Sequence, residues 1–187
     1  MTAVISPPLM PSQSQGRDED ELFFEIIDGQ RVELPLPSIL SSRVLSELQC
    51  ALGSYVVGNR LGEVLGLMLF RLPLPGNRNR RPDVAFVSAQ TIAQAPPQFG
   101  WEDAWAVLPD LMVEVVSPHD LAEDIIERIN EYFSAGTKLM WVIYPTLRLI
   151  YIYESPFQVR ILRESDDLDG GTVLPGFRIP IASLFPG

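Results

Sequence analysis

The sequence predicts one α/β domain whose central sheet mixes antiparallel and parallel strands. Three observations lead to this prediction. From Ser38 onward, apolar patterns follow one another in the order helix, strand, strand, strand, helix, strand. Adjacent strands therefore occur together with one crossover helix, and a crossover of that kind joins parallel neighbours. Finally, the 187 residues are 47% hydrophobic, which suffices for a single buried core. An N-terminal β-hairpin and a C-terminal β-meander are expected to extend or cover that core.

The N-terminal part divides into a tail and a hairpin. Residues 1–20 are rich in Pro, Ser and Gln and end in an acidic cluster, so we expect a flexible tail there. The single folded domain is expected to span 21–187. Within it, 23–27 and 31–34 are strand-like and flank an Asp-Gly turn signal, which predicts a hairpin.

The first half of the core follows from apolar spacing. Ser38 can cap a helix whose apolar residues recur at helical spacing until about 58–59. A long apolar strand is expected over 62–72. The run 73–82 contains Pro, Gly and three arginines, which indicates a loop. A short strand over 83–87 follows.

The second half begins after a longer connection, 88–109, that carries Trp101 and is compatible with a helical turn. Alternating and continuous apolar patterns then predict further elements. These are a strand over 111–116, an amphipathic helix over 120–135, a strand over 139–144, a hairpin or meander over 147–153 and 157–163, a turn at 169–171 and a short helical turn over 181–185.

Composition and charge exclude several classes of protein. The chain has 24 acidic and 14 basic residues, a net charge of -10, which argues against a protein that simply coats nucleic acid. Cys50 is the only cysteine, so a disulfide scaffold is excluded. Because we find neither a secretory signal nor an apolar run of about 20 residues, we expect a cytoplasmic protein without a membrane span.

One charged residue interrupts the most apolar predicted strand. Glu114 lies in LMVEVV, a run otherwise suited to a strand buried on both faces, and a buried carboxylate requires a partner, a proton or a metal. Asp83 begins another predicted strand. If the two strands are neighbours, both carboxylates meet at one end of the sheet, and the Val115 carbonyl can add a ligand. Such oxygen donors suit Mg²⁺ or Mn²⁺.

A site of this kind can activate water and stabilise the charge that builds up during phosphodiester cleavage. Arg78, Arg80 and Arg81 lie in the predicted loop beside it and could hold phosphates. The simpler alternative is that Glu114 pairs with an arginine of a neighbouring element and has a structural role only.

Four stretches also carry a family resemblance, and their order and spacing are more specific than any one of them. They are 24–29 (FEIIDG), 81–84 (RPDV), 109–118 (PDLMVEVVSP) and 132–142 (YFSAGTKLMWV). Together they resemble the Uma family of restriction-endonuclease-like proteins, within the PD-(D/E)XK nuclease superfamily. The resemblance covers about residues 20–187. It implies a restriction-endonuclease-like core, Mg²⁺-dependent cleavage of DNA, and Asp83 and Glu114 as the acidic residues of the two motifs.

The sequence departs from this family pattern at the basic position. In the plain superfamily motif a lysine lies two residues after Glu114, where this chain has Val116. Many members of the family instead carry a basic residue on the following helix, and the matching residue is Arg128. Arginine stays charged and is a poor base, but it can stabilise an anionic transition state. Lys138, the only lysine of the chain, is a weak substitute at the start of the next strand.

Other acidic positions are secondary candidates. Where many relatives carry an acidic residue near 66–68, this chain has Leu67, and Glu63 is the nearest carboxylate. Glu25 could be a further site carboxylate, although a charge on the surface or on an edge strand is the simpler interpretation. His119 fits a loop residue with a minor capacity for proton transfer. Asp120 fits a helix N-cap.

Two functional interpretations follow. The first is a Mg²⁺- or Mn²⁺-dependent DNA endonuclease, attenuated because Arg128 replaces lysine. The second is a nuclease-like fold that no longer cleaves and that binds nucleic acid or another protein. The family resemblance also implies a homodimer.

Overall fold

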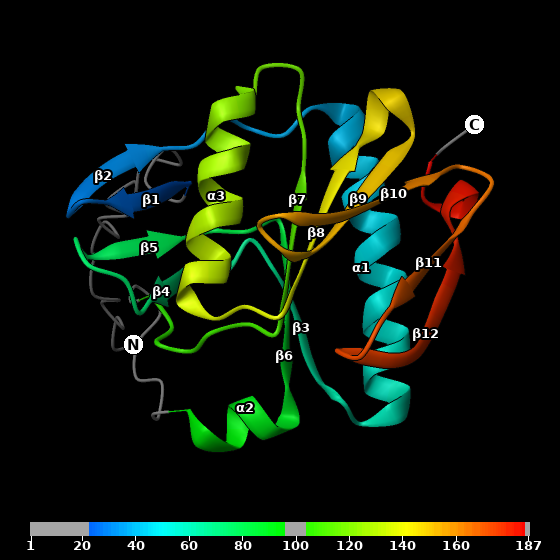
Figure 1. Cartoon of the computed structure of the whole chain (residues 1–187), viewed down its shortest axis with the longest axis horizontal. Coiled ribbons are helices and arrows are strands. Elements are labelled where there is room, and N and C mark those ends of the chain that lie inside the picture. The colour runs from blue at the N-terminus through cyan, green and yellow to red at the C-terminus, as the bar shows by residue number, and fades with distance from the viewer. Residues whose placement is uncertain (1–22, 96–103, 186–187) are drawn as a thin grey trace, which may run out of the picture.

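The computed structural model describes residues 23–95 and 104–185. The predicted tail, 1–20, and Trp101 lie outside these residues. A six-stranded sheet forms the centre of the fold and confirms the predicted mixture of strand directions (Figure 1). Its order is β10-β9-β8-β7-β6-β3, and only the pair β7 and β8 is parallel. The strands are β3 (Gly62–Gly66), β6 (Val84–Ser88), β7 (Leu111–Val115), β8 (Leu139–Tyr144), β9 (Leu149–Ser155) and β10 (Gln158–Arg163).

Two long helices cover opposite faces of this sheet. Helix α1 (Ile39–Asn59) begins as predicted at Ser38, whose side chain accepts a hydrogen bond from the Ser41 N–H. Helix α3 (Ala122–Ala135) connects the parallel strands and lies to the left of the sheet in Figure 1, on the side opposite α1. A short helix, α2 (Ala89–Gln94), follows β6. The two faces have separate apolar cores, one around α1 and one around α3.

Strand alternation decides which side chains of β7 reach each helix. Leu111, Val113 and Val115 belong to the core on the α1 side, whereas Met112 belongs to the core on the α3 side. Because successive side chains of a strand point to opposite faces, Glu114 faces α3 together with Met112. This placement gives the only charged side chain of the strand a helix as its neighbour.

A second sheet lies beside α3 and corrects two predictions. It contains β1 (Phe24–Ile27), β2 (Gln30–Glu33), β4 (Phe70–Leu72) and β5 (Arg78–Arg80), in the order β2-β1-β5-β4. The predicted strand 62–72 is wrong, because Leu67 adopts a left-handed φ of 54° that ends β3 and redirects the chain into β4. The predicted loop 73–82 is wrong in part, because β5 pairs there with β1 and β4.

The C-terminal strands also divide between two sheets. β9 and β10 extend the central sheet as a meander, whereas β11 (Asp167–Gly170) and β12 (Leu174–Pro180) form a separate hairpin. The 3₁₀ turns η2 (Pro145–Leu147) and η3 (Ile181–Leu184) complete the elements. No helix among residues 23–95 and 104–185 has both the length and the apolar character that crossing a membrane requires.

Candidate active site

The two carboxylates singled out by the sequence lie together at one end of the central sheet. In the antiparallel pair β6 and β7, Val84 is opposite Val113, so continuing the register by one residue places Asp83 opposite Glu114. Residues directly opposite in such a pair share a face. Oδ2 of Asp83 also accepts a hydrogen bond of 2.7 Å from the Val115 N–H, which attaches Asp83 to the end of β7.

Both carboxyl groups have strongly perturbed pKa values. Burial raises the pKa of Asp83 to about 6, although the Val115 N–H and Arg128 oppose the rise. Burial also raises the pKa of Glu114 to about 8, and the charge of Asp83 contributes to the rise. A carboxyl group ionises less readily when it is removed from water and lies near a like charge. Near neutral pH Glu114 therefore keeps its proton unless a positive charge is added to the pair.

Helix α3 contributes two side chains to Glu114. Arg128 and Tyr132 lie one turn apart, so they share a face of the helix. The Tyr132 hydroxyl donates a 2.6 Å hydrogen bond to Oε1 of Glu114, and Nη1 of Arg128 lies 3.5 Å from the same oxygen. Tyr132 is not among the site residues predicted from the sequence. The signal that could have found it is its hydroxyl, because a buried tyrosine normally has a hydrogen-bond partner.

Glu25 lies at the centre of a buried group of charges. The interpretation of Glu25 as a surface charge is wrong, because its exposed fraction is 0%. Its carboxylate accepts two hydrogen bonds from Arg128, at 2.7 and 3.0 Å, and one of 2.8 Å from Arg80. The Arg81 N–H donates a fourth, also at 2.8 Å. Strand β1 thus supplies a carboxylate that contacts both β5 and α3.

The three arginines predicted to hold phosphates are already paired inside the protein. Arg78 and Arg80 both bind Glu131 of α3, and Arg80 is only 3% exposed. Arg81 donates to the backbone carbonyls of Phe24 and Leu67. The predicted loop is therefore wrong at Arg78 and Arg80, because strand pairing draws both into β5, where their charges find buried partners. The phosphate-binding role of the three arginines stays a prediction.

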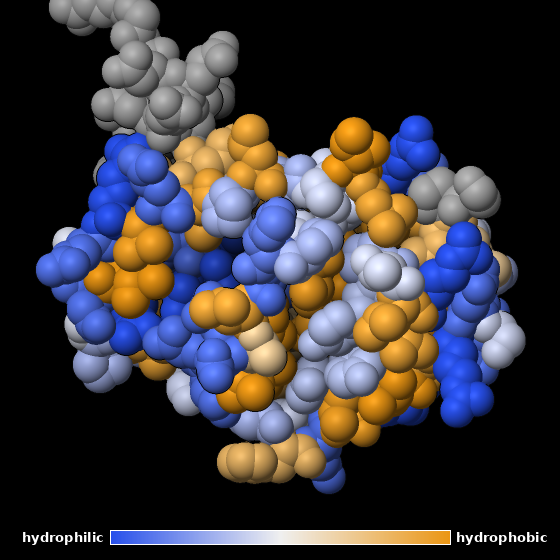
Figure 2. Space-filling model, turned by 90° about the horizontal axis from the view of Figure 1, so that it is seen from above, coloured by the Kyte–Doolittle hydropathy of each residue, from blue (hydrophilic) through white to orange (hydrophobic). Residues whose placement is uncertain are grey.

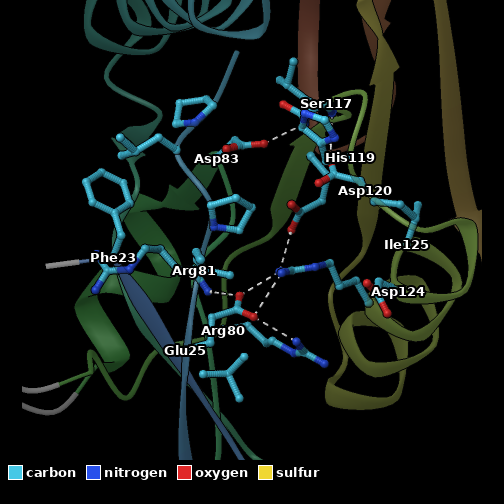
Figure 3. Close-up of a pocket in the computed structure, with 18 of the residues that line it drawn as sticks. Phe23, Glu25, Arg80, Arg81, Asp83, Ser117, His119, Asp120, Asp124 and Ile125 are labelled. Carbon is cyan, nitrogen blue, oxygen red and sulfur yellow. Dashed lines mark hydrogen bonds and ion pairs between the residues drawn. The ribbon is translucent and has the colours of Figure 1, made fainter. Parts of the chain in front are cut away.

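A pocket of about 540 Å³ brings these groups together. One wall is formed by apolar side chains of the hairpin and of the segment before α1, including Phe23, Ile27, Val32, Leu34 and Leu36. Figure 3 shows Glu25, Arg80 and Arg81 close together, with Asp83 pointing across the pocket toward Ser117. Seen from above, the molecule has a hollow with hydrophilic side chains inside and hydrophobic patches around it (Figure 2).

The opposite wall follows β7. His119 and Asp120 both line the pocket there. The predicted N-cap role of Asp120 is wrong, because α3 begins at Ala122 and Asp120 accepts a 2.7 Å hydrogen bond from the Ser117 N–H instead. That turn places His119 at the wall of the pocket, close in sequence to Glu114.

The arrangement suits a divalent cation such as Mg²⁺ by the chemistry of its donors. Within the described residues, Oδ1 of Asp83 and Oε2 of Glu114 accept no hydrogen bond, so each carboxylate keeps an oxygen for a ligand. Among residues 23–95 and 104–185, no group of three or more His, Cys, Asp or Glu side chains is placed to hold a metal ion. Two carboxylates are sufficient for Mg²⁺, which usually keeps several waters and binds one or two carboxylates.

Comparison with known proteins decides the family. A family profile described as "Putative restriction endonuclease", Uma2, matches residues 10–182. The chain belongs to the Uma2 family. This finding confirms the family resemblance predicted from the four sequence stretches.

Among solved structures, the chain is similar to a protein from Anabaena variabilis ATCC 29413 that is described as a putative nuclease belonging to DUF820. The two share 19% sequence identity, with a TM-score of 0.75, over 88% of this chain and 90% of that chain. At this identity the similarity concerns the fold, and it confirms the predicted nuclease-like α/β architecture. No curated protein matches the chain.

Two secondary candidates lie away from the pocket of this Uma2 protein. Lys138 binds Asp110 at 2.5 Å, at the far end of β7 from Glu114, roughly 13 Å along the strand by the usual rise. Glu63 is exposed and pairs with Val87, so it lies toward the opposite end of β6 from Asp83. Leu67, by contrast, lines the pocket at the position where the family resemblance implies an acidic residue.

Proposed function

We propose that this Uma2 protein is a Mg²⁺-dependent DNA endonuclease, able to use Mn²⁺ as well. The observation that carries the proposal is the Asp83 and Glu114 pair, two neighbouring carboxyl groups whose pKa values burial raises to about 6 and about 8. Membership of the family described as "Putative restriction endonuclease" and the similar fold of a protein described as a putative nuclease support it.

In this proposal Asp83, Glu114 and the carbonyl of Val115 hold the cation. When bound, a divalent ion supplies the charge stabilisation and the water activation that phosphodiester hydrolysis requires. Tyr132 keeps Glu114 oriented by donating to Oε1, which leaves Oε2 toward the ligand. Asp83 is oriented in the same way by the Val115 N–H.

Arg128 stabilises negative charge in this proposal and does not accept a proton. Its pKa is raised above the ordinary arginine value: burial opposes the rise, but Glu114, Tyr132 and Glu25 outweigh it. A permanent cation next to the scissile phosphate stabilises the developing charge. Because Arg128 cannot orient water as a neutral lysine can, we infer slower cleavage than the lysine motif would give.

Plasmid nicking tests the proposal directly. Wild-type protein should nick supercoiled DNA in Mg²⁺ or Mn²⁺, and chelator should abolish nicking. Asp83→Asn and Glu114→Gln keep the shape of each side chain and remove its charge, so nicking should fall by at least about 100-fold. The alanine variants should behave alike. Equal nicking by wild type and by the Asp83 and Glu114 variants would contradict the proposal.

The hydrogen bonds of Arg128 favour a second candidate function, a nuclease-like fold that binds nucleic acid or protein without cleaving. Glu25 occupies both Nη atoms of Arg128, so little of the guanidinium is left for a phosphate. Arg128→Lys separates the two candidates. Wild-type inactivity combined with nicking by the variant would favour this second function, whereas robust wild-type cleavage would end it.

The homodimer and the cytoplasmic location stay predictions. Sedimentation equilibrium of the full chain would measure the first, and fractionation of the source cells would measure the second.

A further inference from the structure

Glu25 is the most completely paired carboxylate of the pocket. It is 0% exposed, and its two oxygens accept hydrogen bonds from Arg80, from Arg128 and from the Arg81 N–H. Charged hydrogen bonds of this length, and the bidentate contact with Arg128 above all, fix both position and orientation. Glu25 lies on β1, far from α3 in sequence, so its contact with Arg128 depends on the second sheet.

The same nitrogen of Arg128 lies between two carboxylates. Nη1 is 2.7 Å from Oε1 of Glu25 and 3.5 Å from Oε1 of Glu114. The first distance is a strong hydrogen bond, whereas the second is an ion pair outside hydrogen-bond range. The guanidinium is therefore committed to Glu25 and approaches Glu114 only at one side.

The contacts of the charged groups show what this commitment achieves. Glu25 binds Arg80 and Arg128, and Glu131 binds Arg80 and Arg78, so these arginines make their hydrogen bonds to carboxylates other than Asp83 and Glu114. Asp83 accepts its hydrogen bond from the Val115 N–H, and Glu114 has an ion pair with Arg128 at 3.5 Å but no hydrogen bond from it. The ionised Asp83 and Glu114 pair carries a charge equal and opposite to that of one divalent ion.

We propose that Glu25 is a positioning residue that holds Arg128 away from Glu114 and so keeps the Asp83 and Glu114 pair open to a divalent cation. This inference rests on the proposed function, because it concerns the same pocket. Without the negative charge of Glu25, Arg128 would lose its bidentate partner and turn to Glu114, the nearest remaining carboxylate. Arg128 would then compete with the metal for the same oxygen.

Mn²⁺ binding measured by calorimetry provides the central test, since it needs no cleavage. Glu25→Gln should weaken Mn²⁺ binding by about 10- to 100-fold, the usual effect of removing a residue that orients a metal ligand. Glu25→Asp keeps the charge with a shorter reach and should lie between wild type and Glu25→Gln. Glu123→Gln makes the same change of charge on the exposed surface of α3 and should bind as wild type does.

A double variant separates positioning from a structural role. Glu25→Gln leaves Arg80 and Arg128 short of a counter-charge and can destabilise the fold. Glu25→Gln combined with Arg128→Gln restores the charge balance and removes the competitor. Mn²⁺ affinity should therefore return to within about threefold of wild type, whereas a loss of affinity that persists in the double variant would show that Glu25 does not act through Arg128. Urea unfolding of both variants reports the structural effect separately: a single variant that keeps wild-type stability but binds Mn²⁺ weakly supports positioning.

A metal-free crystal structure of Glu25→Gln keeps this inference distinct from the proposed function. A guanidinium of Arg128 within hydrogen-bond distance of Glu114 would support the inference, whereas an unmoved Arg128 would overturn it. Equal Mn²⁺ affinity of wild type and Glu25→Gln, or no recovery in the double variant, would overturn it too. Absence of any Glu114-dependent Mn²⁺ binding in wild type would instead refute the proposed metal-dependent function.

Discussion

Replacing Glu114 by glutamine is expected to stabilise the metal-free protein by an amount that grows with pH. Burial raises the pKa of Glu114 from 4.5 to about 8. Between these values the unfolded chain has lost the proton while the folded protein keeps it, so the stability of the wild type falls as pH rises. Each pH unit in this window costs about 1.4 kcal/mol, and the loss approaches about 5 kcal/mol above pH 8.

Glutamine avoids this loss, because it does not ionise and its carbonyl can still accept from Tyr132. Urea unfolding of wild type and Glu114→Gln in chelator at pH 5, 7 and 9 measures the difference. The variant should gain about 1, 3 and 5 kcal/mol over wild type, respectively. The surface variant Glu123→Gln should show no such trend. A difference independent of pH, or a wild type that is more stable at pH 9, would refute the reasoning.

Three further variants test other parts of the site. Tyr132→Phe should lower the free energy of unfolding by about 1–3 kcal/mol at pH 9, because ionised Glu114 loses a buried donor, and a loss below about 0.5 kcal/mol would contradict this. Lys138→Ala should lower the free energy of unfolding by about 1 kcal/mol at most, because that side chain is 66% exposed. It should also leave plasmid nicking unchanged, and reduced nicking would indicate that Lys138 takes part in the site. Leu67→Asp places a residue that tolerates the left-handed backbone at the wall of the pocket and adds a third carboxylate there. Calorimetry should therefore show Mn²⁺ binding about tenfold tighter than in wild type, and unchanged or weaker binding would count against the cation site.

The central sheet and its two long helices could be predicted from sequence because they follow local patterns. Apolar spacing predicted α1, α3 and β8 closely, and the single charge in β7 directed attention to Glu114. The position of Asp83 beside Glu114 needed one further step, the assumption that their strands are neighbours. The antiparallel register of β6 and β7 bears out that assumption.

The second sheet could not be predicted in the same way. β5 is a three-residue strand of Arg-Asn-Arg, which has no apolar alternation to mark it. Its pairing with β1 joins residues about fifty positions apart, and only that pairing brings Arg80 to Glu25. Local sequence also gave no sign that Leu67 takes a left-handed conformation, which glycine and asparagine favour. Arginines in a Pro- and Gly-rich run therefore suggested a solvated loop, although tertiary contacts bury them.

The burial of those arginines changes what the net charge of -10 means for function. The pocket is lined by seven acidic residues and three arginines, and each arginine already donates to a carboxylate or a carbonyl of the protein. A phosphate backbone approaching this pocket would therefore meet excess negative charge rather than the basic patch that the sequence suggested. Cations must supply the attraction. The acidity of the chain thus does not argue against a nuclease, but it makes DNA engagement at this pocket dependent on the same divalent ion that the Asp83 and Glu114 pair is proposed to hold.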